Sequence, residues 1–292
     1  MQKIMMKNKD FAVFILTHGR ADNVITFKTL KHQGYTGKIY FIVDNEDKTI
    51  DKYYENFGKE FVKVFDKKKY ADSVDEGNNF DERRTITHAR NACFDIAKDL
   101  GITYFMQLDD DYYTFQYRID NKFNYAMGKV LIRKSFDIII NKLLNFYKKT
   151  NSLSIAMSQG GDWIGGINSN FNTYPLKRKA MNSFICSTER PFKFIGAMNE
   201  DVNTYTTLGS RGGLFFSIPL ISLEQGATQS QEGGITDMYL LYGTYAKSFT
   251  TVMMMPSSVT IKEMGNKNRR LHHSIKWKNT VPVILNEEHK KL

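Results

Sequence analysis

The chain has 292 residues, of which 41% are hydrophobic and 25% are charged, values close to ordinary globular usage. This composition excludes disordered and fibrous proteins, and no apolar run approaches the roughly 20 residues that span a bilayer. Two cysteines, Cys93 and Cys186, are too few for a disulfide framework or, alone, for a zinc site. We therefore expect a soluble, cytoplasmic protein of a reducing compartment that does not bind membranes.

Positive charge is in excess and unevenly distributed. The chain carries 41 Lys+Arg against 31 Asp+Glu, a net charge of +10, which favours a polyanionic partner such as nucleic acid. Half of that excess, six cations less one anion, lies between positions 262 and 278: Lys262, Lys267, Arg269, Arg270, Lys276 and Lys278 against Glu263. The alternative is a solvated lysine-rich surface.

The first third of the chain alternates predicted strands and helices. Apolar runs typical of buried strands occupy residues 11–16, 38–43, 61–65 and 104–108. Helical spacing follows Asp22, which we expect to cap a helix ending at Gly34, and recurs over residues 81–100. Strands separated by helices predict an α/β protein with a parallel sheet of the nucleotide-binding type.

The second half is less regular. It predicts helices over residues 135–148 and 236–245, and strands over 153–157, 183–187, 192–196 and 214–218. The glycine-rich segment 159–166 lacks the Lys-Ser/Thr ending of a phosphate loop, so we assign its Asp162 and Trp163 to the acceptor side. With no repeats and no linker, a single domain is expected, with mixed strands in its second half.

Three aspartates follow the buried strand 104–108. Ligands of open α/β sheets bind beyond the carboxyl ends of the strands, and adjacent carboxylates repel unless a cation lies among them. Oxygen ligands favour Mg²⁺ or Mn²⁺. Asp109 and Asp111 point to the same side of an extended chain, so they are predicted to hold the metal, and Asp109 and Asp110 to contact the donor. The alternative is an acidic turn that caps a helix.

Two neighbouring strand ends supply further candidates for donor binding. Thr17 and Arg20 follow the first strand, where a small residue and a cation can hold a nucleotide and its phosphates near a helix N-terminus. The second strand ends at Asp44, which we assign to donor binding as well.

Glu200 and Asp201 follow the predicted strand 192–196 and open a helix. A helix N-terminus holds a carboxylate in its ionised form, which suits a general base that takes a proton from an attacking hydroxyl. Asp201 is favoured over Glu200 for this role. The alternative is an ordinary helix cap.

The basic C-terminal stretch contains His272 and His273. A neutral imidazole can complete a metal site, and Arg270 or a neighbouring cation can neutralise a leaving diphosphate. The choice between the two histidines stays open, and two adjacent histidines are also common on protein surfaces.

Taken in order, these motifs resemble the GT-A glycosyltransferases: Asp109-Asp110-Asp111 after a buried strand, Glu200-Asp201 before a helix, and a late histidine. The resemblance implies one GT-A-like domain over residues 1–292. Its parts would be a nucleotide-sugar-binding half at about 10–115, an acceptor half at about 116–260 and a basic tail at 261–292. It also implies a nucleotide-sugar donor, expected to be a UDP-sugar, with Mn²⁺ or Mg²⁺, and transfer with inversion.

More narrowly, the strings at 199–205, 233–239 and 243–248 resemble the TET-associated glycosyltransferases of bacteriophages. That resemblance implies transfer of a sugar to hydroxymethylated pyrimidines in double-stranded DNA, in the host cytoplasm. A modified base must be read in the major groove or flipped out, for which aromatic residues can provide stacking. The candidates are Trp163, Phe171, Tyr174 and Trp277, although core packing is the commoner role of an aromatic residue.

Three alternatives use similar motifs. One is a GT-A enzyme with a protein, lipid or polysaccharide acceptor, which would lack salt-sensitive DNA binding. Another is a sugar nucleotidyltransferase, which would release pyrophosphate from a nucleoside triphosphate. The third is a DNA-binding protein with a decayed site, against which the intact Asp109, Asp111 and Asp201 argue.

Overall fold

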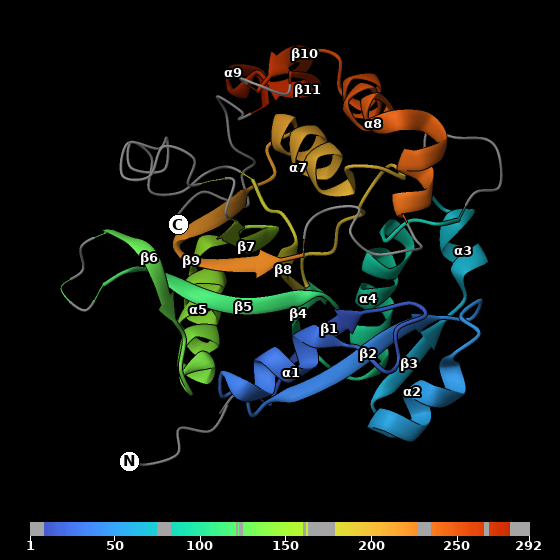
Figure 1. Ribbon diagram of the computed structural model, residues 1–292, viewed down its shortest axis with the longest axis vertical. Coiled ribbons are helices and arrows are strands. Elements are labelled where there is room, and N and C mark those ends of the chain that lie inside the picture. The colour runs from blue at the N-terminus through green and yellow to red at the C-terminus, as the bar shows by residue number, and fades with distance from the viewer. Residues whose placement is uncertain are drawn as a thin grey trace.

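The computed structural model describes residues 9–74, 83–120, 122, 125–159, 162, 179–226, 235–265 and 269–280. These residues form one nine-stranded sheet and a separate two-stranded hairpin (Figure 1). The sheet order is β3 (Val62–Phe65), β2 (Lys38–Asp44), β1 (Phe11–Leu16), β4 (Tyr104–Asp109), β8 (Ser183–Ser187), β7 (Ser154–Gln159), β9 (Phe215–Gln225), β5 (Tyr112–Ile119) and β6 (Tyr125–Leu131).

The sheet is mostly parallel in direction. The pairings β3–β2, β2–β1, β1–β4 and β7–β9 are parallel, and only β8 and β5 run against the other strands. The predicted α/β class, with a parallel first part and mixed strands after it, is confirmed.

Helices cover both faces of the sheet. Strand β1 lies between them, and it is apolar and buried at every position. Its odd residues pack in one core with α1 (Ile25–His32), α2 (Ile50–Phe57) and α5 (Phe136–Thr150). Its even residues pack in a second core with α3 (Lys67–Ala71), α4 (Thr87–Asp99) and α7 (Glu200–Ser210). A strand that is buried on both faces reads as a continuous apolar run, which explains why it was visible in the sequence.

The last described elements pack around α7 and form a cap, with α9 and the hairpin above it and α8 beside it in the view of Figure 1. It consists of α8 (Ile235–Met254), β10 (Val259–Met264), β11 (Arg270–Ile275) and α9 (Trp277–Thr280). The residues expected to form a basic tail thus include an antiparallel hairpin that packs against α8.

Some sequence predictions are wrong in detail. The strand predicted over residues 192–196 is irregular backbone. The Asn91 side chain binds both backbone polar groups of Phe194, so these are not free to pair with a strand: Nδ2 donates to the carbonyl at 3.0 Å and Oδ1 accepts from the amide at 2.8 Å. Asp22 does not cap α1; it contacts Lys52 and Asn56 instead. The predicted helix 236–245 extends to Met254 across a kink at Gly243. The helix predicted over 81–100 begins only at Thr87.

Cys93 and Cys186 are buried free thiols. Within the described ranges, no helix has both the length and the apolar character that crossing a membrane requires.

Gly34 and Gly101 follow α1 and α4 at equivalent positions, both with positive φ (89° and 63°). A Cβ on Gly34 would lie 2.6 Å from the backbone Cα of Lys134, whereas one on Gly101 meets nothing within 4 Å. We expect Gly101→Ala to cost about 1–2 kcal/mol of unfolding free energy, the price of a left-handed alanine, and Gly34→Ala to cost clearly more, because backbone must move. Urea unfolding measures both, and equal losses would contradict the role assigned to the Gly34 contact.

Candidate active site

The aspartate cluster begins at the last residue of β4 and continues into the turn before β5. Thr26 of α1 fixes this turn: its Oγ1 donates to the Asp109 carbonyl at 2.6 Å and accepts from the Tyr112 amide at 2.9 Å. Its amide donates to the Asp110 carbonyl at 3.0 Å. The element that follows is a strand, so the alternative of an acidic cap on a following helix is wrong.

Asp110 joins the loop after β1. Its buried carboxylate accepts from Thr17 Oγ1 and from Arg20 Nη1, both at 2.7 Å. Tyr53 closes the group, since its hydroxyl lies 2.8 Å from Thr17 Oγ1 and accepts from the Arg20 amide at 2.9 Å. The structure therefore brings together three of the residues assigned to the donor: Thr17, Arg20 and Asp110.

Asp44 lies at the adjacent strand end, buried beside the same loop. His18 Nδ1 is 2.6 Å from Asp44 Oδ2, and Lys67 Nζ is 3.4 Å from Oδ1. Burial opposes ionisation of this carboxyl, but the His18 hydrogen bond and Lys67 outweigh it and lower the Asp44 pKa. The same hydrogen bond raises the pKa of His18. The strand ends of β1, β2 and β4 thus carry buried polar groups that lie around one loop, the loop after β1.

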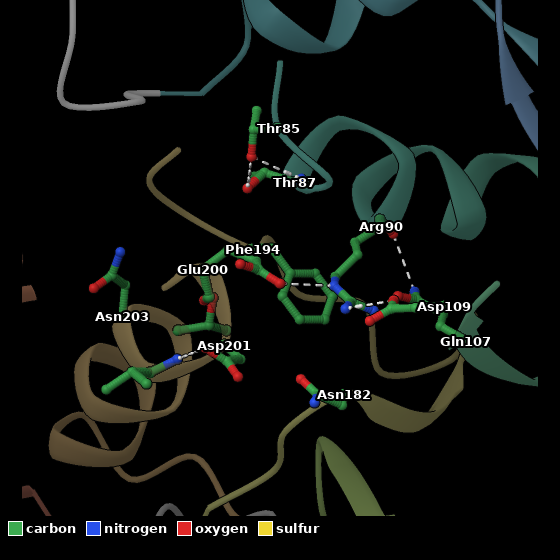
Figure 2. A network of polar contacts seen from close by, with 12 residues as sticks. Thr85, Thr87, Arg90, Gln107, Asp109, Asn182, Phe194, Glu200, Asp201 and Asn203 are labelled. Atoms are coloured by element: carbon green, nitrogen blue, oxygen red, sulfur yellow. Dashed lines mark hydrogen bonds and ion pairs between the residues drawn. The ribbon is translucent and has the colours of Figure 1, made fainter. Parts of the chain in front are cut away.

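Arg90 was not found from the sequence. This buried side chain of α4 donates through Nη2 to Asp109 Oδ1 at 2.9 Å and through Nε to Glu200 Oε1 at 3.0 Å (Figure 2). Its guanidinium carbon lies 4.8 Å from the ring centre of Phe184 and 5.7 Å from that of Phe194. The available signal was an arginine within the apolar stripe of the predicted helix, four residues after Ile86 and three before Cys93.

Glu200 and Asp201 form the first turn of α7, as predicted, and differ in their partners. Glu200 is committed to Arg90. Asp201 is buried, and its Oδ1 accepts from the Val202 amide at 2.7 Å. Burial, together with the neighbouring charge of Glu200, raises the pKa of Asp201 to about 7. Of this pair, Asp201 is therefore the carboxylate whose pKa is raised to near neutrality.

Helix α4 also positions the segment that leads into α7. Thr87 Oγ1 donates to the Gly196 carbonyl at 2.7 Å, and Thr85 Oγ1 donates to the Ala197 carbonyl at 2.9 Å. Asn199 then adopts a left-handed conformation (φ 55°) directly before Glu200. The approach of α7 is consequently set by side chains of the first turn of α4 and of the residues just before it.

The hairpin brings His273 toward the acceptor-side carboxylates rather than toward the aspartate cluster. His273 Nδ1 lies 3.4 Å from Asn199 Nδ2, and burial lowers the His273 pKa to about 3, so the ring is neutral. His272 packs on His273, with its Nδ1 2.7 Å from the His273 carbonyl oxygen. Arg270 is exposed at the start of β11, opposite Met264. Among the described contacts, none joins these three residues to Asp109, Asp110 or Asp111.

The remaining acceptor candidates are only partly described. Asp162 accepts from the Gln159 amide at 3.0 Å and pairs with Lys179. The ring of Trp277 stacks on Tyr205 of α7, with centroids 6.0 Å apart. Trp163, Phe171 and Tyr174 lie outside the described residues.

The aspartate cluster has the chemistry that a hard divalent cation requires. Arg90 pairs with Asp109 and Arg20 with Asp110, but among the described residues no ion pair reaches Asp111. Burial and the two neighbouring aspartates raise the pKa of Asp111 to about 7. Within the described ranges, no three His, Cys, Asp or Glu side chains are arranged to hold a metal unaided. Mg²⁺ is commonly held by one or two carboxylates plus substrate phosphates, which this arrangement fits.

The family model described as "TET-Associated Glycosyltransferase" matches residues 11–234, most of the chain. The chain belongs to this family. Membership confirms the resemblance noted in the sequence and the predicted enzyme class, a nucleotide-sugar-dependent glycosyltransferase. A search of curated proteins finds no match.

Solved structures resemble the chain at low sequence identity. Glucosyl-3-phosphoglycerate synthase from Mycobacterium tuberculosis, in complex with Mg²⁺ and uridine diphosphate, is 8% identical over 91% of this chain and 87% of its own, with a TM-score of 0.45. The mannosyltransferase PcManGT from Pyrobaculum calidifontis, in complex with GDP-Man and Mn²⁺, is 10% identical over 85% of this chain and 74% of its own, with a TM-score of 0.47.

Proposed function

We propose that this glycosyltransferase moves a sugar from a nucleotide-sugar donor to the hydroxymethyl group of a modified pyrimidine in double-stranded DNA, with inversion. The observation that carries the chemistry is that two sets of carboxylates, one on the donor side and one on the acceptor side, are joined through Arg90. Donor-side aspartates end β4, and a buried carboxylate that titrates near neutrality, Asp201, opens α7. The DNA acceptor is suggested by the family.

Donor binding is assigned to the loop after β1 and to the strand ends beside it. Thr17, Arg20 and Asp110 form one hydrogen-bonded group, with Asp44 nearby at the end of β2. UDP and GDP-Man are bound in the structures of the mycobacterial and archaeal enzymes, which agrees with a nucleotide-sugar donor here.

Asp111 and Asp109 are the residues that would hold Mn²⁺ or Mg²⁺. The bound cation would neutralise the charge that develops on the leaving diphosphate. On the protein side, Arg90 keeps Asp109 in place and Arg20 keeps Asp110 in place, so that the carboxylate cluster has a fixed shape before the donor arrives.

Asp201 is assigned the role of general base. It takes the proton of the acceptor hydroxyl while that oxygen bonds to the anomeric carbon and the bond from the sugar to the diphosphate breaks. Glu200 is the weaker candidate, because Arg90 already holds its carboxylate. A pKa near the working pH is the condition under which a base is both ionised and basic enough.

DNA binding is assigned to the outer face of the β10–β11 hairpin. Lys262 stands opposite His272, and Arg270 opposite Met264, on the strand positions that alternate with the inward-facing His273. Lys276 and Lys278 continue this exposed positive surface. Because the inner side of the hairpin meets Asn199 next to Glu200, phosphates bound outside it would hold DNA close to the proposed base.

The first prediction concerns the reaction. Protein, Mn²⁺, nucleotide sugars and DNA containing hydroxymethylcytosine should yield a new nucleoside, heavier by one sugar, and removal of divalent cations by a chelator should abolish it. Mass spectrometry of the digested DNA measures this product and names the sugar. Hydrolysis of the donor without a new nucleoside would contradict the DNA acceptor. Product formed equally in the chelator would contradict the metal.

The second prediction concerns the base. Wild-type turnover should rise with pH around an apparent pKa of about 7, since only ionised Asp201 accepts a proton. Asp201→Asn should lose at least about 100-fold in kcat while donor affinity, measured by calorimetry, stays unchanged. Glu200→Gln is the matched control and should retain far more activity. Near-normal turnover of Asp201→Asn would rule out Asp201 as the base.

The third prediction concerns DNA. The double variant Lys262→Gln/Arg270→Gln should bind duplex DNA more weakly, with the slope of log affinity against log salt reduced by about 2, roughly one for each lost phosphate contact. Turnover on free hydroxymethyldeoxycytidine should persist. Lys142→Gln/Lys149→Gln on α5, away from the hairpin, is the matched control. Equal losses in both variants would place the DNA elsewhere.

A further inference from the structure

We propose that Arg90 is the positioning residue that joins the two sides of the catalytic site, holding Glu200 as a fixed anion beside Asp201 and tying α7 to the carboxylate end of β4. The inference rests on the proposed function, because it assigns a role within the same site. It goes beyond the proposed function, which uses Arg90 only to hold Asp109, by giving Arg90 a role at the acceptor-side carboxylates as well.

The position of Arg90 supports this role. It lies in α4, and its two carboxylate partners lie 19 and 110 residues further along the chain, at the end of β4 and the start of α7. Figure 2 shows its guanidinium between the Asp109 and Glu200 side chains. Its own carbonyl accepts from Gln107 Nε2 of β4 at 3.0 Å, so the main chain of the helix is attached to the same strand.

The chemistry of this site requires an arginine. Nε and Nη2 lie on one edge of a rigid planar fork and reach two different carboxylates at the same time. Phe184 and Phe194 lie within cation–π distance of that plane and restrict its rotation. A lysine ammonium keeps the charge but lacks the planar fork, so it holds the two carboxylates less rigidly.

The charges around Asp201 show what the bridge does chemically. Glu200, on the same helical turn, favours the protonated form of Asp201, whereas Lys247 of α8 and Arg90 favour the ionised form. Two other titratable groups lie near this place. The negative charge of Asp162, like that of Asp201, raises the pKa of the Tyr205 hydroxyl, and His273 on the hairpin is neutral. Arg90 therefore offsets part of the effect that the negative charge of Glu200 has on the pKa of Asp201. Losing Arg90 and losing Glu200 should change the basicity of Asp201 in opposite directions.

The test compares two variants that break the same ion pair. In Arg90→Met, Glu200 stays negative without compensation, so the midpoint of the acidic limb of the pH–rate profile should shift to higher pH by roughly one pH unit, the usual effect of one nearby charge. In Glu200→Gln the midpoint should shift to lower pH. The double variant Arg90→Met/Glu200→Gln should have a midpoint between the two. If both single variants lose rate with unmoved midpoints, or move in the same direction, Arg90 has only a structural role and the proposal is overturned.

Arg90→Lys separates charge from geometry. It should keep the wild-type midpoint because the positive charge remains, while kcat falls because the fork is lost. A wild-type kcat in this variant would contradict positioning. If Arg90→Met does not fold, Arg90→Lys and the charge-balanced double variant still decide the matter, with thermal unfolding as the control for integrity.

The outcome is distinguishable from a failure of the proposed function. If wild-type protein makes no new nucleoside from hydroxymethylated DNA, the acceptor assignment fails. The midpoints are then read from donor hydrolysis, in which water takes the place of the acceptor hydroxyl, and the opposite shifts still test Arg90.

Discussion

Arg90 and Glu200 are buried ions and Asp109 is a partly exposed one, and taking an ion out of water has an effective cost of several kcal/mol when its burial is complete. Arg90, Asp109 and Glu200 offset this cost only by keeping their hydrogen bonds, because removal of one partner would leave an uncompensated buried charge. The arrangement therefore tolerates little movement of α4, β4 or α7 relative to one another. The rest of the site is built on elements whose spacing this ion triad fixes.

The same helix that carries Arg90 also supports the irregular backbone that leads into α7. Thr87 and Asn91 hydrogen-bond the main chain at Gly196 and Phe194, polar groups that a neighbouring strand would otherwise satisfy. Helix α4 thus substitutes for strand pairing at this edge. As a result the chain can leave the sheet and begin a new helix at Glu200, directly opposite the aspartate cluster.

What the sequence reveals depends on how local the determining interactions are. The strand 104–108, its three aspartates and the Glu200-Asp201 pair are visible because burial and chain direction act within a few residues. Phe192 and Phe194 gave a strand-like pattern because both pack in the core, but their backbone partners come from α4, far away in sequence. The β10–β11 hairpin was hidden, since Lys262 and Arg270 lie on its outer face and obscure the inner positions Ile261, His273 and Ile275.

The division of labour between Glu200 and Asp201 shows why the site could not be read completely from the chain. Both residues lie in the first turn of α7, and the helix N-terminus favours the ionised form of each one. The distinction arises from a third residue: Arg90 reaches Glu200, and Asp201 keeps a high proton affinity because it is buried beside that fixed anion. An arginine-bound carboxylate and a buried carboxylate with a raised pKa thus occupy adjacent positions, and the difference in their partners depends on a contact that spans 110 residues.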